Sequence, residues 1–289
     1  MRPFFCHREE ILMEKLRNFR RAIGYVLLFL VIQFVCTLLI DGAAQAYFQF
    51  AEPDRAALLY EEFVETYGTV ILMSSQVLTL LILIAIAKLR GMSLWDMVQG
   101  GQAVRKNQAL FLLLAGVCGN ILTTGVMDLL PLPEQLMESY NQASQGLNTS
   151  LLWADLLSVA FFAPLVEELI FRGLVLSRLR AALPGWLAVL LQGLVFGFVH
   201  GQLVWIIYAS LFGFLLGYVR LRTGSLAASI LLHLGFNLSS FFIGIVFYLA
   251  PQNFLGQLLV TLLGGGAMVV FLLKAFQEPR RREWEEWEE

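Results

Sequence analysis

Long runs of apolar residues recur along the chain, and they restrict its possible folds more than any other feature. Several runs approach or exceed the roughly 20 residues that a helix needs to cross about 30 Å of hydrocarbon. Helices are the elements to expect there, because hydrocarbon offers no partner to a free backbone N–H group. We therefore predict an all-α, polytopic bundle of about eight transmembrane helices. The predicted spans are Ile23–Ile40, Thr69–Ala87, Ala109–Met127, Leu151–Val166, Trp186–His200, Val204–Val219, Leu226–Leu249 and Leu255–Leu273.

The composition excludes several other classes of protein. Hydrophobic residues make up 58% of the chain and charged residues 15%, whereas a soluble domain has about 45–50% and about 25%. A soluble core cannot bury that excess, so a soluble enzyme, a disordered chain and a secreted disulfide scaffold are all excluded. The net charge of −2 argues against a nucleic-acid partner. The expected partner is the lipid bilayer.

The basic residues predict the orientation of the bundle. Of the 20 Lys and Arg residues, 19 lie in segments that the predicted spans place on one side, and only Arg55 lies on the other. By the positive-inside rule the basic side is cytoplasmic, which places both termini in the cytoplasm. The compact form and this bias fit a multi-pass protein of the plasma membrane, the inner membrane of the cell.

The predicted spans divide the chain into three parts. Residues 1–22 are expected to form a cytoplasmic, interfacial amphipathic segment. Residues 23–276 are expected to form the bundle, and residues 277–289 a charged cytoplasmic tail. Residues 56–67 resemble a second amphipathic segment, on the outer face. No internal repeat is evident, so any chemistry is expected inside the bundle.

Polar side chains interrupt the apolar runs of the second half of the chain. An ionisable group at the centre of a membrane helix costs from about 2.5 kcal/mol upward, and is by default a functional candidate. Three predicted helices carry such groups. The candidate site residues are Glu167, Glu168, Arg172, His200, His233 and Asn237.

Helical spacing predicts which of these groups meet. Glu168 and Arg172 are four residues apart with the acid first, the favoured order for an ion pair. Glu167 is rotated by about 100° from Glu168, so it is left to face another group. His233 and Asn237 are also four residues apart and can point into one cavity.

Together these groups can deprotonate a water molecule and stabilise an oxyanion, and they could alternatively hold a metal ion. Both routes lead to hydrolysis of an amide or an ester. Structural alternatives also exist: Glu167 and Glu168 could mark a helix end with Arg172 snorkelling to the surface, and His or Asn could simply join helices. At the level of function, a catalytically silent immunity or scaffold protein and a proton- or metal-coupled transporter remain open.

Two features concern the fifth and sixth spans. Each has only about 16 residues, or about 24 Å, and counting places His200 nearer the outer face than Glu167 and His233. The hairpin must therefore tilt or turn within the membrane if these residues are to meet. The pairs Gly193/Gly197 and Gly213/Gly217 form GxxxG patterns, which predict close helix packing.

The three polar motifs resemble those of the CPBP family of intramembrane proteases, the CAAX-protease and bacteriocin-processing group that includes the type II CAAX prenyl endopeptidases. That family has EExxxR, FxxxH and HxxxN or HxxxD on successive membrane helices. This chain has Glu167-Glu168 with Arg172, then Phe196 with His200, then His233 with Asn237. The matching core covers about residues 151–249.

The resemblance implies a helical-bundle endopeptidase that cleaves near the end of a membrane-associated peptide, of the prenylated or the bacteriocin type. Glu167 would be the general base, with His200 helping to activate the water. His233 and Asn237 would stabilise the oxyanion, and Glu168 and Arg172 would orient the site. A metal-free glutamate mechanism and a zinc metalloprotease are both implied, the zinc ligands being Glu167 or Glu168 with His200 and His233.

Overall fold

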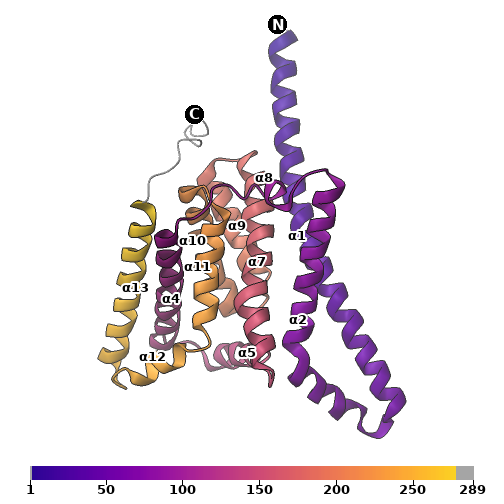
Figure 1. Cartoon of the computed structure of the whole chain (residues 1–289), viewed down its shortest axis with the longest axis vertical. Coiled ribbons are helices and arrows are strands. Elements are labelled where there is room, and N and C mark those ends of the chain that lie inside the picture. The colour runs from indigo at the N-terminus through magenta and orange to yellow at the C-terminus, as the bar shows by residue number, and fades with distance from the viewer. Residues whose placement is uncertain (1, 278–289) are drawn as a thin grey trace.

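The computed structural model describes residues 2–277, which are almost entirely helical (Figure 1). The predicted all-α class is confirmed, since the only β feature among these residues is one isolated bridge between Gly101 and Ser225. The elements outside the central helix described below are α1 (Arg2–Ala51), η1 (Pro53–Arg55), α2 (Ala56–Leu89), α3 (Leu94–Met97), α4 (Lys106–Leu129), α5 (Glu134–Gln145), α9 (Gly185–Phe198), α10 (Leu203–Thr223), α11 (Leu226–Ser239), α12 (Ile243–Leu249) and α13 (Phe254–Gln277).

Five of the described helices, α1, α2, α4, α10 and α13, are long and apolar enough to cross a membrane. Helices α11 and α12 meet at an angle of 58° and become a sixth span if they are counted together. Helix α9 is apolar but has only 14 residues. The structure thus supports a multi-pass bundle with five or six spans by these criteria, fewer than the eight predicted.

One uninterrupted helix carries the two adjacent glutamates. Helical residues run from Leu152 to Arg180, well beyond the predicted end at Val166. Two stretches of this helix have the wider π geometry. The segments, in order, are α6 (Leu152–Asp155), η2 (Leu156–Phe162), α7 (Ala163–Glu168), η3 (Leu169–Val175) and α8 (Leu176–Arg180). The glutamates therefore lie in a helix interior between two π stretches, which are frequent at functional sites.

Helix α1 contains both the predicted interfacial segment and the first predicted span. From Arg2 onward the segment 1–22 is continuous with the membrane-spanning part in one helix of 50 residues. No proline or glycine lies between Arg8 and Ile23, so nothing in the sequence ends the helix there. Residues 56–67 are likewise the first turns of α2. The predicted tail 277–289 lies outside the described residues from position 278 onward.

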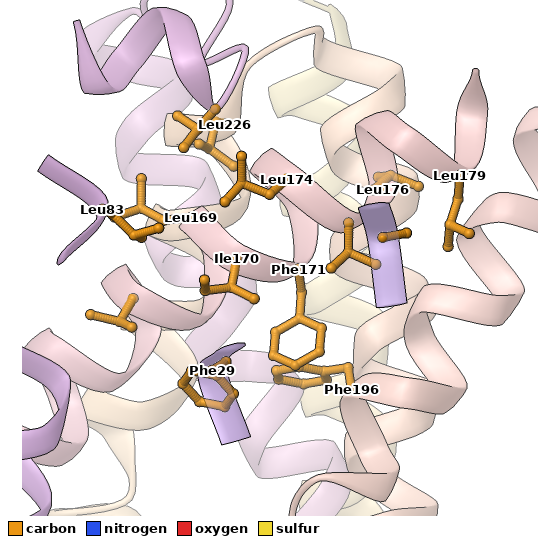
Figure 2. Packing of buried hydrophobic residues seen from close by; sticks show 14 of the residues in the cluster. Phe29, Leu83, Leu169, Ile170, Phe171, Leu174, Leu176, Leu179, Phe196 and Leu226 are labelled. Carbon is orange, nitrogen blue, oxygen red and sulfur yellow. The ribbon is translucent and has the colours of Figure 1, made fainter. Parts of the chain in front are cut away.

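Two hydrophobic clusters hold the bundle together. The first joins α1, α2, η3 and α9, and Figure 2 shows Phe29 and Leu83 packed beside Leu169, Ile170 and Phe171. The Phe29 and Phe171 rings meet edge to face, 5.8 Å apart. The second cluster joins α4, α10, α11 and α13 through buried side chains. These include Leu112, Leu216, Leu232, Phe236 and Leu272.

Close helix contacts rest on glycines, as the GxxxG patterns predict. A Cβ atom at Gly193 would lie 2.2 Å from the Phe214 ring, and one at Gly197 would lie 2.0 Å from Ser210 Oγ. Real Cβ atoms do not approach so closely, so α9 and α10 can meet only where a side chain is absent. The tight pairing fixes α9, and with it the segment that carries His200, against α10.

Buried polar side chains fix the start of the Leu152–Arg180 helix. The carboxylate of Asp155 is 3% exposed and accepts hydrogen bonds from the Thr69 hydroxyl of α2 at 2.7 Å and the Thr149 hydroxyl at 2.7 Å. The Thr149 backbone N–H donates to the second carboxylate oxygen of Asp155 at 3.0 Å. This network ties the helix that carries the glutamates to α2.

Candidate active site

A buried ion pair lies in the middle of the Leu152–Arg180 helix. Arg172 Nη1 is 2.7 Å from Glu168 Oε1, and both side chains have a solvent-exposed fraction of 0%. The ion pair predicted from the spacing is therefore present. The alternative of a helix end with a snorkelling arginine is wrong, because neither group reaches the surface.

His233 of α11 lies against both glutamates. Its Nδ1 is 3.0 Å from Glu168 Oε1, and its Nε2 is 3.8 Å from Glu167 Oε2. Because Arg172 holds Glu168 as a carboxylate, which can only accept, the proton of the 3.0 Å hydrogen bond belongs to Nδ1. Nε2 is thereby left to interact on the side of Glu167.

The neighbouring carboxyl groups differ sharply in access to solvent. The Glu167 side chain is 19% exposed, whereas that of Glu168 is completely buried. The difference follows from the rotation of about 100° between consecutive residues of a helix. Glu167 is therefore the carboxylate that water or a substrate can reach.

The Phe196 ring of α9 connects the ion pair with both histidines. The Arg172 Cζ atom lies over this ring, 4.1 Å from its centroid. The His200 and His233 rings meet it edge to face at centroid distances of 4.9 and 5.8 Å. The two imidazoles thus share one aromatic neighbour, although they come from different helices.

The shortness of α9 explains how His200 comes so close. The helix ends at Phe198, and His200 lies in the turn that follows, with Nδ1 2.7 Å from the Phe196 carbonyl oxygen. Gly201, with φ of +74°, then reverses the chain into α10. The hairpin of α9 and α10 therefore turns after only 14 helical residues, as a meeting of His200 with Glu167 and His233 requires.

Asn237 lies one turn beyond His233 on α11. Its Nδ2 donates a hydrogen bond to the Val159 carbonyl oxygen of η2 at 2.9 Å. The second N–H of the amide and its carbonyl oxygen are not used by this contact. The structure thus places Asn237 at the junction of α11 with the helix that carries the glutamates.

Two further residues, Gly213 and Gln192, belong to the hydrogen-bond network of the arginine, and the three polar motifs do not include them. The Gly213 carbonyl oxygen of α10 accepts from Arg172 Nη2 at 3.3 Å and from Gln192 Nε2 at 2.8 Å. Gln192 is completely buried in α9. A lone carboxamide within an apolar run is the signal that could have found it, because a buried amide must be hydrogen-bonded.

The residues expected to bind zinc are poorly arranged for that role. Within residues 9–277, no three His, Cys, Asp or Glu side chains are grouped so as to hold a metal ion. Glu168 is used by Arg172 and His233, and His233 presents its two nitrogens to two different carboxylates. In the described part of the chain, the expected set of Glu167 or Glu168 with His200 and His233 is therefore not grouped for metal binding.

Comparison with known proteins identifies the segment that contains these residues. Residues 149–239 match the family model "Rce1-like: Type II CAAX prenyl endopeptidase Rce1-like". No curated protein and no solved structure matches the chain. The family predicted from the three motifs is thus confirmed over the segment that carries all six candidate residues.

Proposed function

We propose, from the premise that residues 149–239 are a type II CAAX prenyl endopeptidase Rce1-like domain, that this chain is an intramembrane endopeptidase. It hydrolyses a peptide bond of a membrane-associated substrate, with Glu167 as the general base. The family match supports a protease embedded in a membrane. The assignment of roles to single residues rests on the geometry of the site.

The observation that carries this proposal is that the two adjacent glutamates differ in burial and in their partners. Glu168 is fully buried and held by Arg172, so it can neither meet a substrate nor take up a proton without leaving a buried cation unpaired. Glu167 is partly exposed and faces His233. Of the two carboxylates, only Glu167 has both access and freedom to exchange a proton.

The reaction follows from these positions. Glu167 accepts a proton from water while His200 helps to orient that water, and the resulting hydroxide attacks the carbonyl carbon of the scissile bond. The negative charge on the tetrahedral oxygen is stabilised by His233 Nε2 and the Asn237 amide. Glu167 then returns its proton to the leaving amine.

The net charge of the buried cluster supports the role of His233 as a hydrogen-bond donor to the oxyanion. To donate from Nε2 while Nδ1 bonds to Glu168, the imidazole must carry both protons. With His233 protonated, two cations stand beside two carboxylates, Glu167 and Glu168, and the four groups sum to zero charge. A neutral cluster costs less to bury than an unbalanced one.

The finer features of the protein are part of the same proposal. With the Leu152–Arg180 helix and α9 counted beside the five or six spans described above, the chain has about eight membrane helices with both termini in the cytoplasm, and it resides in the plasma membrane. The substrate is a peptide anchored at the membrane, either prenylated near its C-terminus or of the bacteriocin type. The mechanism is the metal-free glutamate one, because the candidate ligands do not converge.

The direct test is cleavage of a defined peptide by the full chain in lipid nanodiscs. A fluorogenic peptide with a farnesylated cysteine in a CAAX terminus is compared with the same peptide without the lipid. Wild type should cleave the farnesylated peptide, and Glu167→Gln and His200→Ala should lose the activity while keeping the wild-type unfolding temperature. Glu138→Gln, on α5, is the matched control, and it should cleave normally.

The same experiment separates the alternatives. If both site variants cleave like wild type, the proposed roles are wrong. If no peptide is cleaved by any variant, including a set of unlipidated library peptides, and Glu167→Gln instead lowers the unfolding temperature, the chain is a silent scaffold. Residue-dependent ion flux into vesicles without proteolysis would indicate a transporter.

A further inference from the structure

A polar cavity lies between α1, α2 and α8, and no candidate active-site residue lines it. Its volume is about 590 Å³. Helix α1 lines it with Arg21, Gly24 and Tyr25, which share one face because they are three and four residues apart. Arg90 comes from the end of α2, and Arg178 from α8. Three guanidinium groups from three helices thus surround one cavity.

Nothing in the described part of the chain neutralises this concentration of positive charge. Residues 9–277 place no carboxylate in an ion pair with Arg21, Arg90 or Arg178. Arg90 Nη1 donates to the Tyr25 hydroxyl at 3.3 Å, and the buried Nε of Arg178 has no hydrogen-bond partner. Converging cations with free donors are a site for an anion, and guanidinium is well suited to phosphate.

The remaining walls of the cavity are apolar. Leu28 and Ile86 belong to the predicted spans Ile23–Ile40 and Thr69–Ala87, whereas Arg21 and Arg90 stand just beyond the ends of those runs. Figure 1 shows α8 beside α1 and the end of α2, at the end of the bundle where the first turns of α1 project. A cationic rim above an apolar floor matches the junction of a phospholipid headgroup with its acyl chains.

We propose that this cavity binds the phosphate of an anionic phospholipid. Basic pockets between membrane helices are suited to such headgroups. A lipid accounts for both the arginines and the apolar floor, whereas a small anion accounts for the arginines alone. Gly24 supports the assignment, because a Cβ atom placed there would have nothing within 4 Å, so the space beside it is open.

Packing gives the bound lipid a structural consequence. Phe29, next to Leu28, meets Phe171, and Phe171 in turn meets Phe196 at a ring distance of 5.2 Å. A lipid that bridges Arg21, Arg90 and Arg178 holds α1 against the helix that carries Glu167. We therefore expect it to raise the stability of the whole bundle.

The test measures lipid binding directly and needs no activity assay, so its outcome is independent of the proposed protease function. The full chain in detergent is titrated with phosphatidylglycerol or with phosphatidylcholine, and retained lipid is counted by native mass spectrometry alongside the unfolding temperature. Separate titrations with glycerol phosphate and inorganic phosphate distinguish a lipid site from a site for free phosphate.

Four variants are compared with wild type. Arg90→Gln and Arg178→Gln each remove one charge, and we expect each to weaken phosphatidylglycerol binding about fivefold. Gly24→Leu fills the cavity without removing a charge and should abolish the retained lipid. Gly42→Leu, at an equally open position on the same helix but outside the cavity, is the matched control and should bind as wild type does.

The expected result is selective retention of phosphatidylglycerol over phosphatidylcholine, with an unfolding temperature that rises most in wild type and Gly42→Leu, less in the arginine variants and not in Gly24→Leu. Equal binding of both lipids, or equal retention by Gly24→Leu and Gly42→Leu, would overturn the proposal. So would stabilisation by glycerol phosphate or inorganic phosphate to the same extent as by the lipid. If the arginine variants bind lipid normally but raise the KM for a peptide with a free C-terminal carboxylate, the cavity serves the substrate instead.

Discussion

Glu167 and Glu168 are consecutive residues, yet the side chain of the first is 19% exposed and that of the second is completely buried. His233 contacts both carboxylates, through Nε2 and Nδ1 respectively. One imidazole therefore links an accessible carboxylate to a buried one. The proposed chemistry and the stability of the site both depend on this arrangement.

The buried ion pair should be needed for stability. Glu168→Leu or Arg172→Leu alone leaves an uncompensated buried charge, and each should lower the free energy of unfolding by about 3–5 kcal/mol. The double variant removes both charges of the pair and should recover much of that loss. Thermal unfolding in one detergent at one scan rate measures all three. A double variant less stable than both single variants would contradict this account of the pair.

The tight contact of α9 with α10 should not tolerate a methyl group. In Gly197→Ala the new Cβ atom would lie 2.0 Å from Ser210 Oγ and 2.5 Å from the Ile206 carbonyl oxygen, and the backbone cannot yield cheaply. We expect a loss of stability of about 1–3 kcal/mol, with reduced turnover because His200 moves. Gly266→Ala on α13, where nothing lies within 4 Å, is the control and should unfold and turn over as wild type does.

Asn237 should affect turnover more than binding. If its amide stabilises the oxyanion, Asn237→Ala should lower kcat by about 100-fold while KM changes little. Asn120→Ala provides a control, because Asn120 is also a buried amide that binds α11, through the Phe236 carbonyl oxygen and Ser239 Oγ. That variant should lose stability and retain its kcat. If Asn237→Ala instead weakens substrate binding, seen as a higher KM with an unchanged kcat, Asn237 is assigned to packing.

Chelation should leave the activity unchanged. The carboxylates and imidazoles of the site do not converge on one point, so we expect neither stoichiometric zinc in the purified protein nor a loss of cleavage after treatment with phenanthroline. Elemental analysis and the peptide assay measure these two properties. One zinc per chain, lost in His200→Ala and His233→Ala, would require a metal mechanism.

Much of the site followed from the sequence because helical spacing is a local property. The positions of Glu168 and Arg172 predicted their ion pair, and the adjacency of Glu167 predicted that it would face another group. The free-energy cost of placing a charge in a membrane was the second guide, since an ionisable residue in an apolar helix is seldom without a partner.

Other features depend on tertiary packing and could not be read from spacing. The π stretches that flank α7 and the early end of α9 at Phe198 have no clear local signal. The contacts of Gly213 with Arg172 and Gln192 join three elements that are distant in the sequence. The continuity of α1 across residue 22 has a different reason, because charge patterning marks a membrane boundary but does not end a helix.

The 14 residues of α9 span about 21 Å, roughly 9 Å less than a hydrocarbon layer of about 30 Å. Its outer face is nevertheless apolar, with Trp186, Leu190, Leu194 and Phe198 exposed at every fourth position. Lipid beside such a helix must become thinner to match it. Thinning would bring the aqueous phase closer to the turn at His200. The short length of α9 would thereby give water access to the site of the proposed hydrolysis.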